Sequence, residues 1–191
     1  MKRRFIFFCL VLLALLLGTN GAQAVTVDYY NIGTFQTPSL HEGGVTVTGS
    51  ANVNVLNLNG LGIVGGLDDN TIDGAGHESI SFLFDTPAKD VTYFVNIAGN
   101  TNGDGLTGET LLTAYGTGGY LGDIAVISAG TKNVSALFGN VPISSFAVSL
   151  NTADYIRIAS VGYNPVPLPG AMWLLGSGLA GLFGLRRRFK K

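Results

Sequence analysis

The sequence has one cysteine among its 191 residues, Cys9, and this residue lies in an apolar run close to Met1. Phe8 precedes it at the position where a lipoprotein signal has a small residue, so lipid attachment at Cys9 is not expected. The rest of the chain has no thiol, which excludes disulfide bonds, thiolate nucleophiles and cysteine-ligated metals. A secreted form of this chain must therefore be stable in an oxidising compartment without disulfides.

Basic residues are scarce between residues 25 and 164. This stretch contains Lys89, Lys132 and Arg157 against all 12 acidic residues, a net charge of −9, although the whole chain carries only −1. The other eight basic residues lie near the two ends. A domain of this charge repels phosphate backbones, which disfavours nucleic-acid binding, and it attracts divalent cations.

Residues 1–24 have the three parts of a secretory signal peptide. Basic residues at positions 2–4 precede an apolar run from Phe5 to Leu17. Ala22 and Ala24 are the small residues expected at a signal-peptide cleavage site before Val25. The apolar run has 13 residues, whereas a transmembrane helix needs about 20. We therefore expect export by the general secretion machinery and cleavage before Val25.

Between residues 25 and 164 the sequence alternates apolar with small or polar residues, the pattern of half-buried strands. Runs of glycine and asparagine separate the alternating segments, and no long segment has helical periodicity. The pattern predicts an all-β domain over residues 25–164, an antiparallel β-sandwich of jelly-roll type. The expected strands are 25–30, 45–49, 51–59, 78–84, 91–97, 110–115, 123–128, 134–138, 144–150 and 155–161.

Residues 165–191 combine three features in a fixed order. The first feature is an extended backbone with few N–H hydrogen-bond donors, which a protease can bind. It is favoured by the sequence Val166, Pro167, Leu168 and Pro169. The uncharged stretch 170–185 follows and would span about 24 Å as a helix, short of the roughly 30 Å of a hydrocarbon core. Arg186, Arg187 and Arg188 then favour a cytoplasmic end. This order predicts a transient insertion into the inner membrane.

These features resemble the PEP-CTERM sorting signal, in its proteobacterial VPLPA-type variant. Gly170 stands where that variant usually has alanine, and Leu168 replaces the glutamate of the founding motif. The resemblance implies removal of the tail by an exosortase, in a Gram-negative bacterium that makes extracellular polysaccharide, and delivery to the cell surface or extracellular matrix. A simple tail anchor is the alternative. The matching residues are Val166 to Pro169, Trp173, Leu174, Gly176 to Leu179, Gly181, Leu182 and Arg186 to Arg188.

Two polar segments are candidate Ca²⁺ sites, because Ca²⁺ takes six to eight oxygen ligands from flexible loops. The first site would use Asp68, Asn70, Asp73 and Glu78. The second, weaker because Leu111 occupies the position of the last ligand, would use Asn100, Asn102 and Asp104. The alternative is that these residues only close turns through side-chain to backbone hydrogen bonds.

Little in the sequence predicts catalysis. His41 and His77 each precede a glutamate, but neighbouring residues on a strand point to opposite faces. A glycosidase using two carboxylates stays open, because glycoside hydrolysis requires only that two such groups meet in space. Seven tyrosines offer rings that could stack on sugars. We expect a non-enzymatic surface or matrix protein associated with exopolysaccharide and biofilm, with a calcium-assisted, lectin-like carbohydrate-binding module as the alternative and a secreted glycoside hydrolase third.

Overall fold

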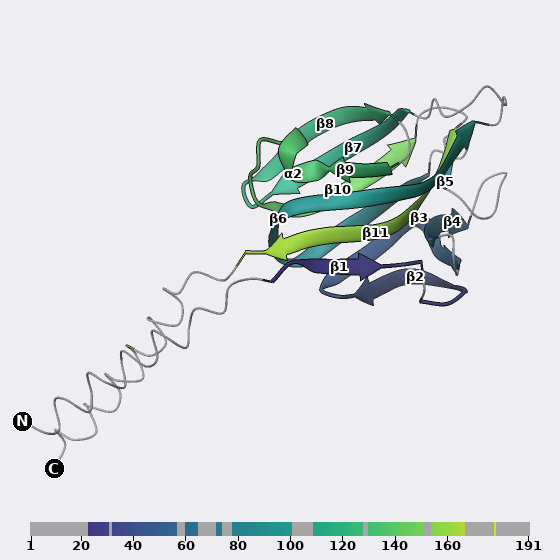
Figure 1. The fold of residues 1–191 in the computed structure, drawn as a ribbon, viewed down its shortest axis with the longest axis horizontal. Helices are drawn as coiled ribbons and strands as arrows, with labels where there is room; N and C mark the ends of the chain where they lie inside the picture. The colour runs from purple at the N-terminus through teal and green to yellow at the C-terminus, as the bar shows by residue number, and fades with distance from the viewer. Residues whose placement is uncertain are drawn as a thin grey trace, which may run out of the picture. The chain divides into compact units, whose positions relative to one another are not determined.

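The computed structural model describes residues 23–30, 32–56, 60–64, 72–73, 78–100, 109–127, 130–150, 154–166 and 178. Gln23–Val166 forms one compact unit (Figure 1). Its described elements are β1 (Val25–Asp28), β2 (Phe35–Glu42), β3 (Val45–Leu56), β4 (Gly60–Val64), β5 (Ile72–Asp73), β6 (Ser79–Asn100), β7 (Glu109–Gly116), β8 (Gly119–Ile127), β9 (Gly130–Asn133), α2 (Val134–Leu137), β10 (Ile143–Leu150) and β11 (Asp154–Pro165).

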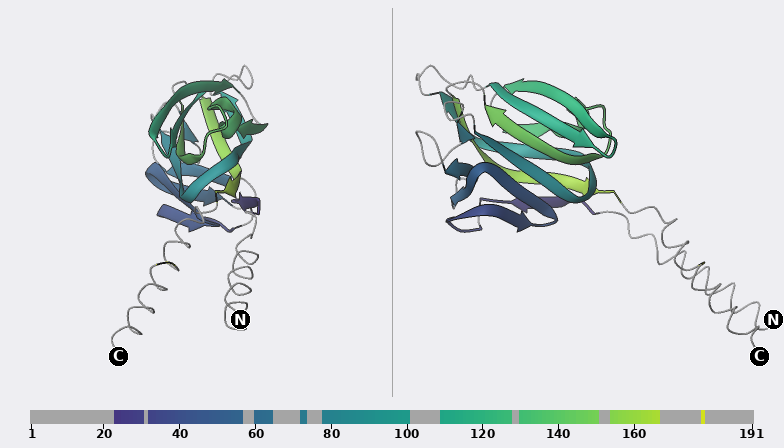
Figure 2. Two further views of the ribbon diagram at one scale, coloured as in Figure 1. Left: turned by 90° about the vertical axis from the view of Figure 1, so that its left-hand side faces the viewer. Right: turned by 180° about the vertical axis from the view of Figure 1, so that it is seen from behind.

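The strands form two layers that enclose the core (Figure 2). The first layer has the order β2–β3–β6–β10–β7–β8. In the second layer β11 lies between β6 and β1, β9 pairs with the other side of β6, and β5 pairs with β11. β4 pairs with β3 along its length and with β11 at Leu61, so it connects the two layers. Every pairing among the described strands is antiparallel. The predicted antiparallel sandwich is therefore confirmed.

Strand β6 belongs to both layers. Its first half pairs with β3 and β10, and its second half pairs with β11 and β9. The strand changes layer around Pro87 to Asp90, where Asp90 takes a φ of 51° that non-glycine residues rarely adopt. One 22-residue strand thus joins the two layers through the backbone itself.

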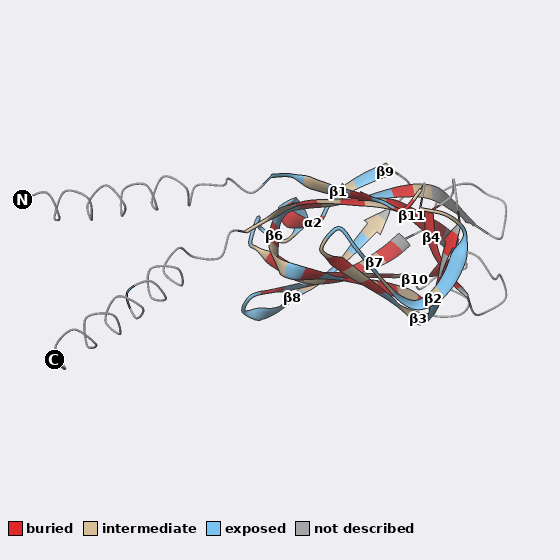
Figure 3. Cartoon of the chain, turned by 90° about the horizontal axis from the view of Figure 1, so that it is seen from below, coloured by how far each residue is buried: buried red, intermediate tan, exposed pale blue. Residues whose placement is uncertain are grey.

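The core forms because each strand alternates between the interior and the solvent (Figure 3). On β6, Ile80, Phe82 and Phe84 are buried, whereas Leu83 and Asp85 are exposed. Aromatic rings fill the space between the layers. Phe146 of β10 stacks on Phe82 and on Tyr93, with ring centroids 4.7 Å and 5.6 Å apart. The ring centroids of Phe84 and Tyr163 are 4.8 Å apart.

The prediction of a strand at residues 134–138 is wrong. Val134–Leu137 form the single-turn helix α2, which is started by the Asn133 side chain accepting a hydrogen bond of 2.9 Å from the Ala136 N–H. The Ser135 hydroxyl, which is buried, accepts a bond of 2.8 Å from the Val91 N–H. Local capping and this tertiary bond override the period-two pattern of the segment.

The predicted signal peptide and membrane segment lie almost wholly outside the described residues. Residues 1–22 fall outside them, as do residues 170–185 with the exception of Gly178. Of the helices that the structure describes, none has the length and apolar character to cross a membrane.

Candidate functional site

The segment predicted to be read by the sorting machinery begins where the sandwich ends. β11 stops at Pro165, and the Val166 N–H donates a hydrogen bond of 2.8 Å to the Pro87 carbonyl. At the N-terminus of the compact unit, Ala24 is exposed and β1 begins at Val25, which pairs with Tyr163 near the end of β11. The described sandwich therefore lies between the two predicted processing points. The remaining processing residues, Ala22, Pro167, Leu168, Pro169, Arg186, Arg187 and Arg188, lie outside the described residues.

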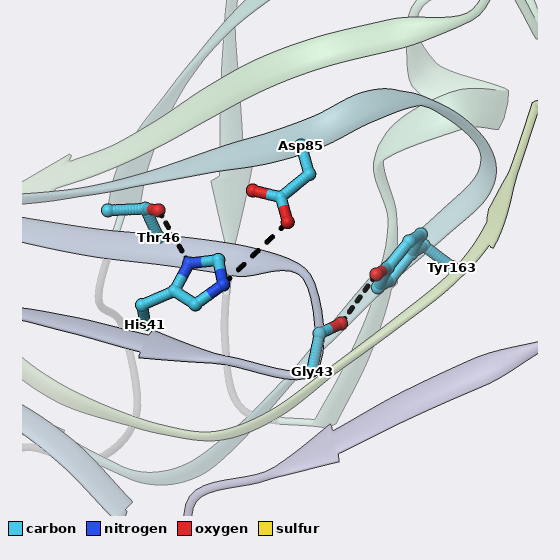
Figure 4. Close-up of polar contacts among 5 residues, drawn as sticks. All are labelled: His41, Gly43, Thr46, Asp85 and Tyr163. Carbon is cyan, nitrogen blue, oxygen red and sulfur yellow. Dashed lines mark hydrogen bonds and ion pairs between the residues drawn. The ribbon is translucent and has the colours of Figure 1, made fainter.

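The hairpin between β2 and β3 contacts Tyr163 of β11 (Figure 4). Gly43 and Gly44 form its two-residue turn with φ values of 54° and 78°, which glycine adopts without strain. The Tyr163 hydroxyl donates a hydrogen bond of 2.6 Å to the Gly43 carbonyl. A Cβ atom at Gly44 would lie 2.6 Å from the same hydroxyl oxygen. Burial, with a contribution from the Asp85 charge, raises the pKa of Tyr163.

His41, Thr46 and Asp85 meet on the solvent side of this hairpin (Figure 4). His41 Nδ1 lies 2.9 Å from Thr46 Oγ1, and His41 Nε2 lies 3.7 Å from Asp85 Oδ2. The histidine and aspartate side chains are 57% and 58% exposed. Such an open contact lacks the water-excluded setting that activates a nucleophile, and an exposed ion pair is worth about 0–1 kcal/mol. The partner of His41 is Asp85, not the adjacent Glu42.

The same histidine begins a line of residues that crosses the whole first layer. Each member lies directly opposite the next on the neighbouring strand, so all share the outer face of the layer. Every member is exposed or half-buried. We call this line the outer row, and it consists of His41, Thr46, Leu83, Ser145, Tyr115 and Tyr120.

A second line runs parallel to the outer row, two residues away along each strand except where a bulge in the β7–β8 pairing widens the step on β8. Small residues make up most of it, and none of its members is fully buried. These side chains are smaller than the tyrosines, histidine and leucine of the outer row. This polar row consists of Ser39, Thr48, Ser81, Ala147, Thr113 and Asp123.

The two rows end together at the β7–β8 hairpin. Tyr115 and Tyr120 are 42% and 60% exposed, with ring centroids 5.7 Å apart and planes inclined by 59°. Hydrogen bonds from Thr113 and Tyr120 to the Asp123 carboxylate lower the pKa of that carboxyl group. The bond to Asp123 also raises the pKa of Tyr120. The sequence offered seven tyrosines, and the structure buries Tyr29, Tyr93 and Tyr163 in the core but exposes this pair.

The candidate calcium ligands are not brought together within the described residues. Asp73 lies in β5 opposite Tyr155, Asn100 ends β6 opposite Asp154, and Glu78 is 3% exposed. In the part of the chain that the structure describes, no three His, Cys, Asp or Glu residues are grouped as a metal site would require. Both calcium sites stay predictions. Asp68, Asn70, Asn102 and Asp104 lie outside the described residues.

The burial of Arg157 was not predicted from the sequence. Arg157 is 3% exposed on β11, and its Nη1 donates a hydrogen bond of 3.2 Å to the Gly60 carbonyl. Gly60 has a φ of 92°, and a Cβ there would lie 2.5 Å from the Ile158 carbonyl oxygen. In the alternating segment YIRIASV, the arginine occupies a position that the pattern assigns to the solvent face. The alternation therefore did not predict that Arg157 is buried.

The comparisons with known proteins find a sorting motif and a likeness to solved structures. Among solved structures, the chain is similar to one described as "X-ray structure of GH31 CBM32-2 bound to GalNAc", with 12% identity, a TM-score of 0.30, and coverage of 73% of this chain and 97% of that one. None of the curated proteins matches the chain. The model of the PEP-CTERM protein-sorting motif, a motif associated with exosortase processing, matches residues 165–188. The chain therefore carries a PEP-CTERM protein-sorting motif that begins at Pro165, the final residue of β11.

Proposed function

We propose that this protein is exported, held briefly in the inner membrane, trimmed by an exosortase within a VPLPA-type signal, and delivered to the surface or extracellular matrix of a Gram-negative cell. The observation that carries the proposal is the match of the sorting motif to residues 165–188. The fold supports it, because the last described hydrogen bond of the sandwich is made by Val166, at the start of the Val-Pro-Leu-Pro sequence. Cleavage beyond Pro169 would leave every described strand complete.

We also propose that the exported sandwich acts without catalysis, as an acidic component of a polysaccharide-rich exterior such as a biofilm matrix. Its net charge of −9 favours solubility and disfavours phosphate-bearing partners. The one described contact of histidine, hydroxyl and carboxylate is open to water. An assay of the protein on the host's own exopolysaccharide should show no turnover.

Intact mass spectrometry of the protein recovered from outside the cell tests the sorting proposal. We expect a species that lacks residues 1–24 and the residues beyond about Pro169. A strain without the exosortase should retain the tail in its membrane fraction. Recovery of an untrimmed C-terminal segment from wild-type cells would support a simple tail anchor instead.

Carbohydrate binding is the second candidate function, and the exposed Tyr115–Tyr120 pair beside Asp123 favours it. Aromatic rings supply apolar area, and carboxylate oxygens accept hydrogen bonds from hydroxyl groups. In the calcium-assisted form of this proposal, Ca²⁺ bound by Asp68, Asn70, Asp73 and Glu78 would support the binding. Polysaccharide pull-down with and without EDTA tests that form, because chelation should then abolish binding.

A further inference from the structure

The two tyrosine rings at the β7–β8 hairpin are more exposed than hairpin stability requires. A cross-strand aromatic pair contributes about 0.2–1 kcal/mol, and it does so best when the rings cover each other. Here the rings are 42% and 60% exposed and inclined by 59°, so much of their apolar area still faces water. Rings with an apolar body and a polar rim favour a partner that is itself apolar on one face and hydroxylated at its edges. A pyranose ring has this character.

Asp123 gives this end of the face a fixed hydrogen-bond acceptor. Thr113, on the neighbouring strand, and Tyr120 both donate to its carboxylate. These bonds orient the carboxylate beside the rings and keep it ionised at neutral pH. An ionised carboxylate has about four acceptor positions, so it can still accept bonds from the hydroxyl groups of a ligand.

The outer row continues this end of the face across six strands. Neighbouring strands lie about 4.8 Å apart, so the row extends over about 24 Å. Ser145 and Thr46 are small, and Leu83, which is 55% exposed, adds apolar area at the middle of the row. A continuous strip of this length fits an extended chain better than a single small molecule.

Charge restricts the type of chain. Asp85 and Asp123 are exposed on this face, and neither row contains a lysine or an arginine. The three basic residues of the body lie in the second layer or its edge, with Lys89 and Arg157 in the β6–β11 pairing and Lys132 on β9. A polyanionic chain such as a uronate or a sulfated glycan would meet only negative charge here.

We propose that the outer row is a binding face for an extended neutral polysaccharide, with Tyr115 and Tyr120 stacking on its sugar rings and Asp123 accepting hydrogen bonds from its hydroxyl groups. This inference rests on the proposed function at a polysaccharide-rich exterior and adds the face and the ligand class. It differs from the calcium-assisted form, because none of the candidate calcium ligands belongs to either row.

Isothermal titration calorimetry on the full chain in mild detergent tests the inference. The probes are a soluble neutral β-glucan, a soluble neutral galactan and polygalacturonate, each with and without EDTA. The variants are Tyr115→Ala, Tyr120→Ala and, as a variant that blocks the row without removing a ring, Ser145→Glu. Phe94→Ala is the matched control, because Phe94 is a 39% exposed ring on the second-layer half of β6. Circular dichroism confirms that each variant is folded.

We expect binding of at least one neutral glucan or galactan, no binding of polygalacturonate, and no effect of EDTA. Each tyrosine variant should weaken binding about ten-fold, which corresponds to about 1.4 kcal/mol. Ser145→Glu should weaken binding by a similar factor. The dissociation constant of Phe94→Ala should stay within about two-fold of that of the parent. A tyrosine variant that does not fold leaves Ser145→Glu to decide the result.

Three outcomes overturn the inference. If neutral polysaccharide binds the tyrosine and Ser145 variants as tightly as the parent, binding occurs at another surface, and the proposed function is unaffected. Binding that EDTA abolishes supports the calcium-assisted alternative. Self-association through the β8 edge, seen by light scattering as a dimer that Tyr120→Ala dissociates while no glycan binds, identifies the rings as a protein contact. Failure of the sorting proposal is detected separately, by the mass of the exported protein.

Discussion

Replacing Phe146 with alanine should remove a large part of the free energy of unfolding of the sandwich. Phe146 is 1% exposed and its ring packs on Phe82, Phe84 and Tyr93, which come from both halves of β6 and so from both layers. Deleting a buried phenylalanine side chain costs about 3–5 kcal/mol. Because domains of this size have free energies of unfolding of about 5–15 kcal/mol, the variant should lose about a fifth or more of that free energy.

Urea unfolding followed by far-ultraviolet circular dichroism measures this loss. For a slope of about 2 kcal/mol/M, a cost of about 4 kcal/mol lowers the unfolding midpoint by about 2 M. Leu83→Ala is the matched control, since Leu83 lies on the same strand as Phe82 but is 55% exposed, and it should cost less than about 1 kcal/mol. If the free energy of unfolding of Phe146→Ala lies within about 1 kcal/mol of that of the parent, the aromatic contacts between the layers do not stabilise the sandwich as argued.

Three further predictions follow from individual contacts. Burial raises the pKa of Tyr93 from 10.0 to about 12, so the folded chain keeps this proton between about pH 10 and 12 while the unfolded chain releases it. Stability is therefore unchanged below pH 10, and urea unfolding should show about 2 kcal/mol lost by pH 12 and a smaller loss in Tyr93→Phe. Tyr163→Phe removes the hydrogen bond to Gly43 and should cost about 1 kcal/mol at neutral pH in the same assay, and an unchanged midpoint would contradict this role. Asn133→Ala removes the cap of α2 and should cost about 1 kcal/mol, whereas Asn133→Asp should cost little; equal losses would show that capping is not the cause.

The sheet character of the chain could be predicted from the sequence because alternation is a local property. Val45 and Val47 are buried on either side of Thr46, as the period of two requires. Strand β2 was missed because FQTPSLHE contains Pro38 and has no alternation, and most of its residues are exposed at the margin of the first layer. The continuity of β6 could not be predicted, since the segment from Thr86 to Asp90 reads as a turn, and only tertiary pairing on both sides keeps it extended.

The candidate site was less accessible to sequence analysis. The sequence shows seven tyrosines, but their division into core and surface depends on register, and the sequence pattern did not predict that Tyr115 lies opposite Tyr120. The turn Gly116 to Gly119 between two alternating segments is the signal that could have placed this pair on one hairpin. The outer row could not be predicted from the sequence, because its members come from six strands whose order is set by the fold.

The register of β1 against β11 determines how the sandwich responds to a mechanical load. Val25 pairs with Tyr163, so the two ends of the described sandwich lie at the same end of one antiparallel pair. Tension applied between Val25 and Val166 would peel β1 from β11 one hydrogen bond at a time, starting at that end, instead of loading all the bonds of the pair together. The sandwich therefore resists this pull less than a pull that shears β1 along β11.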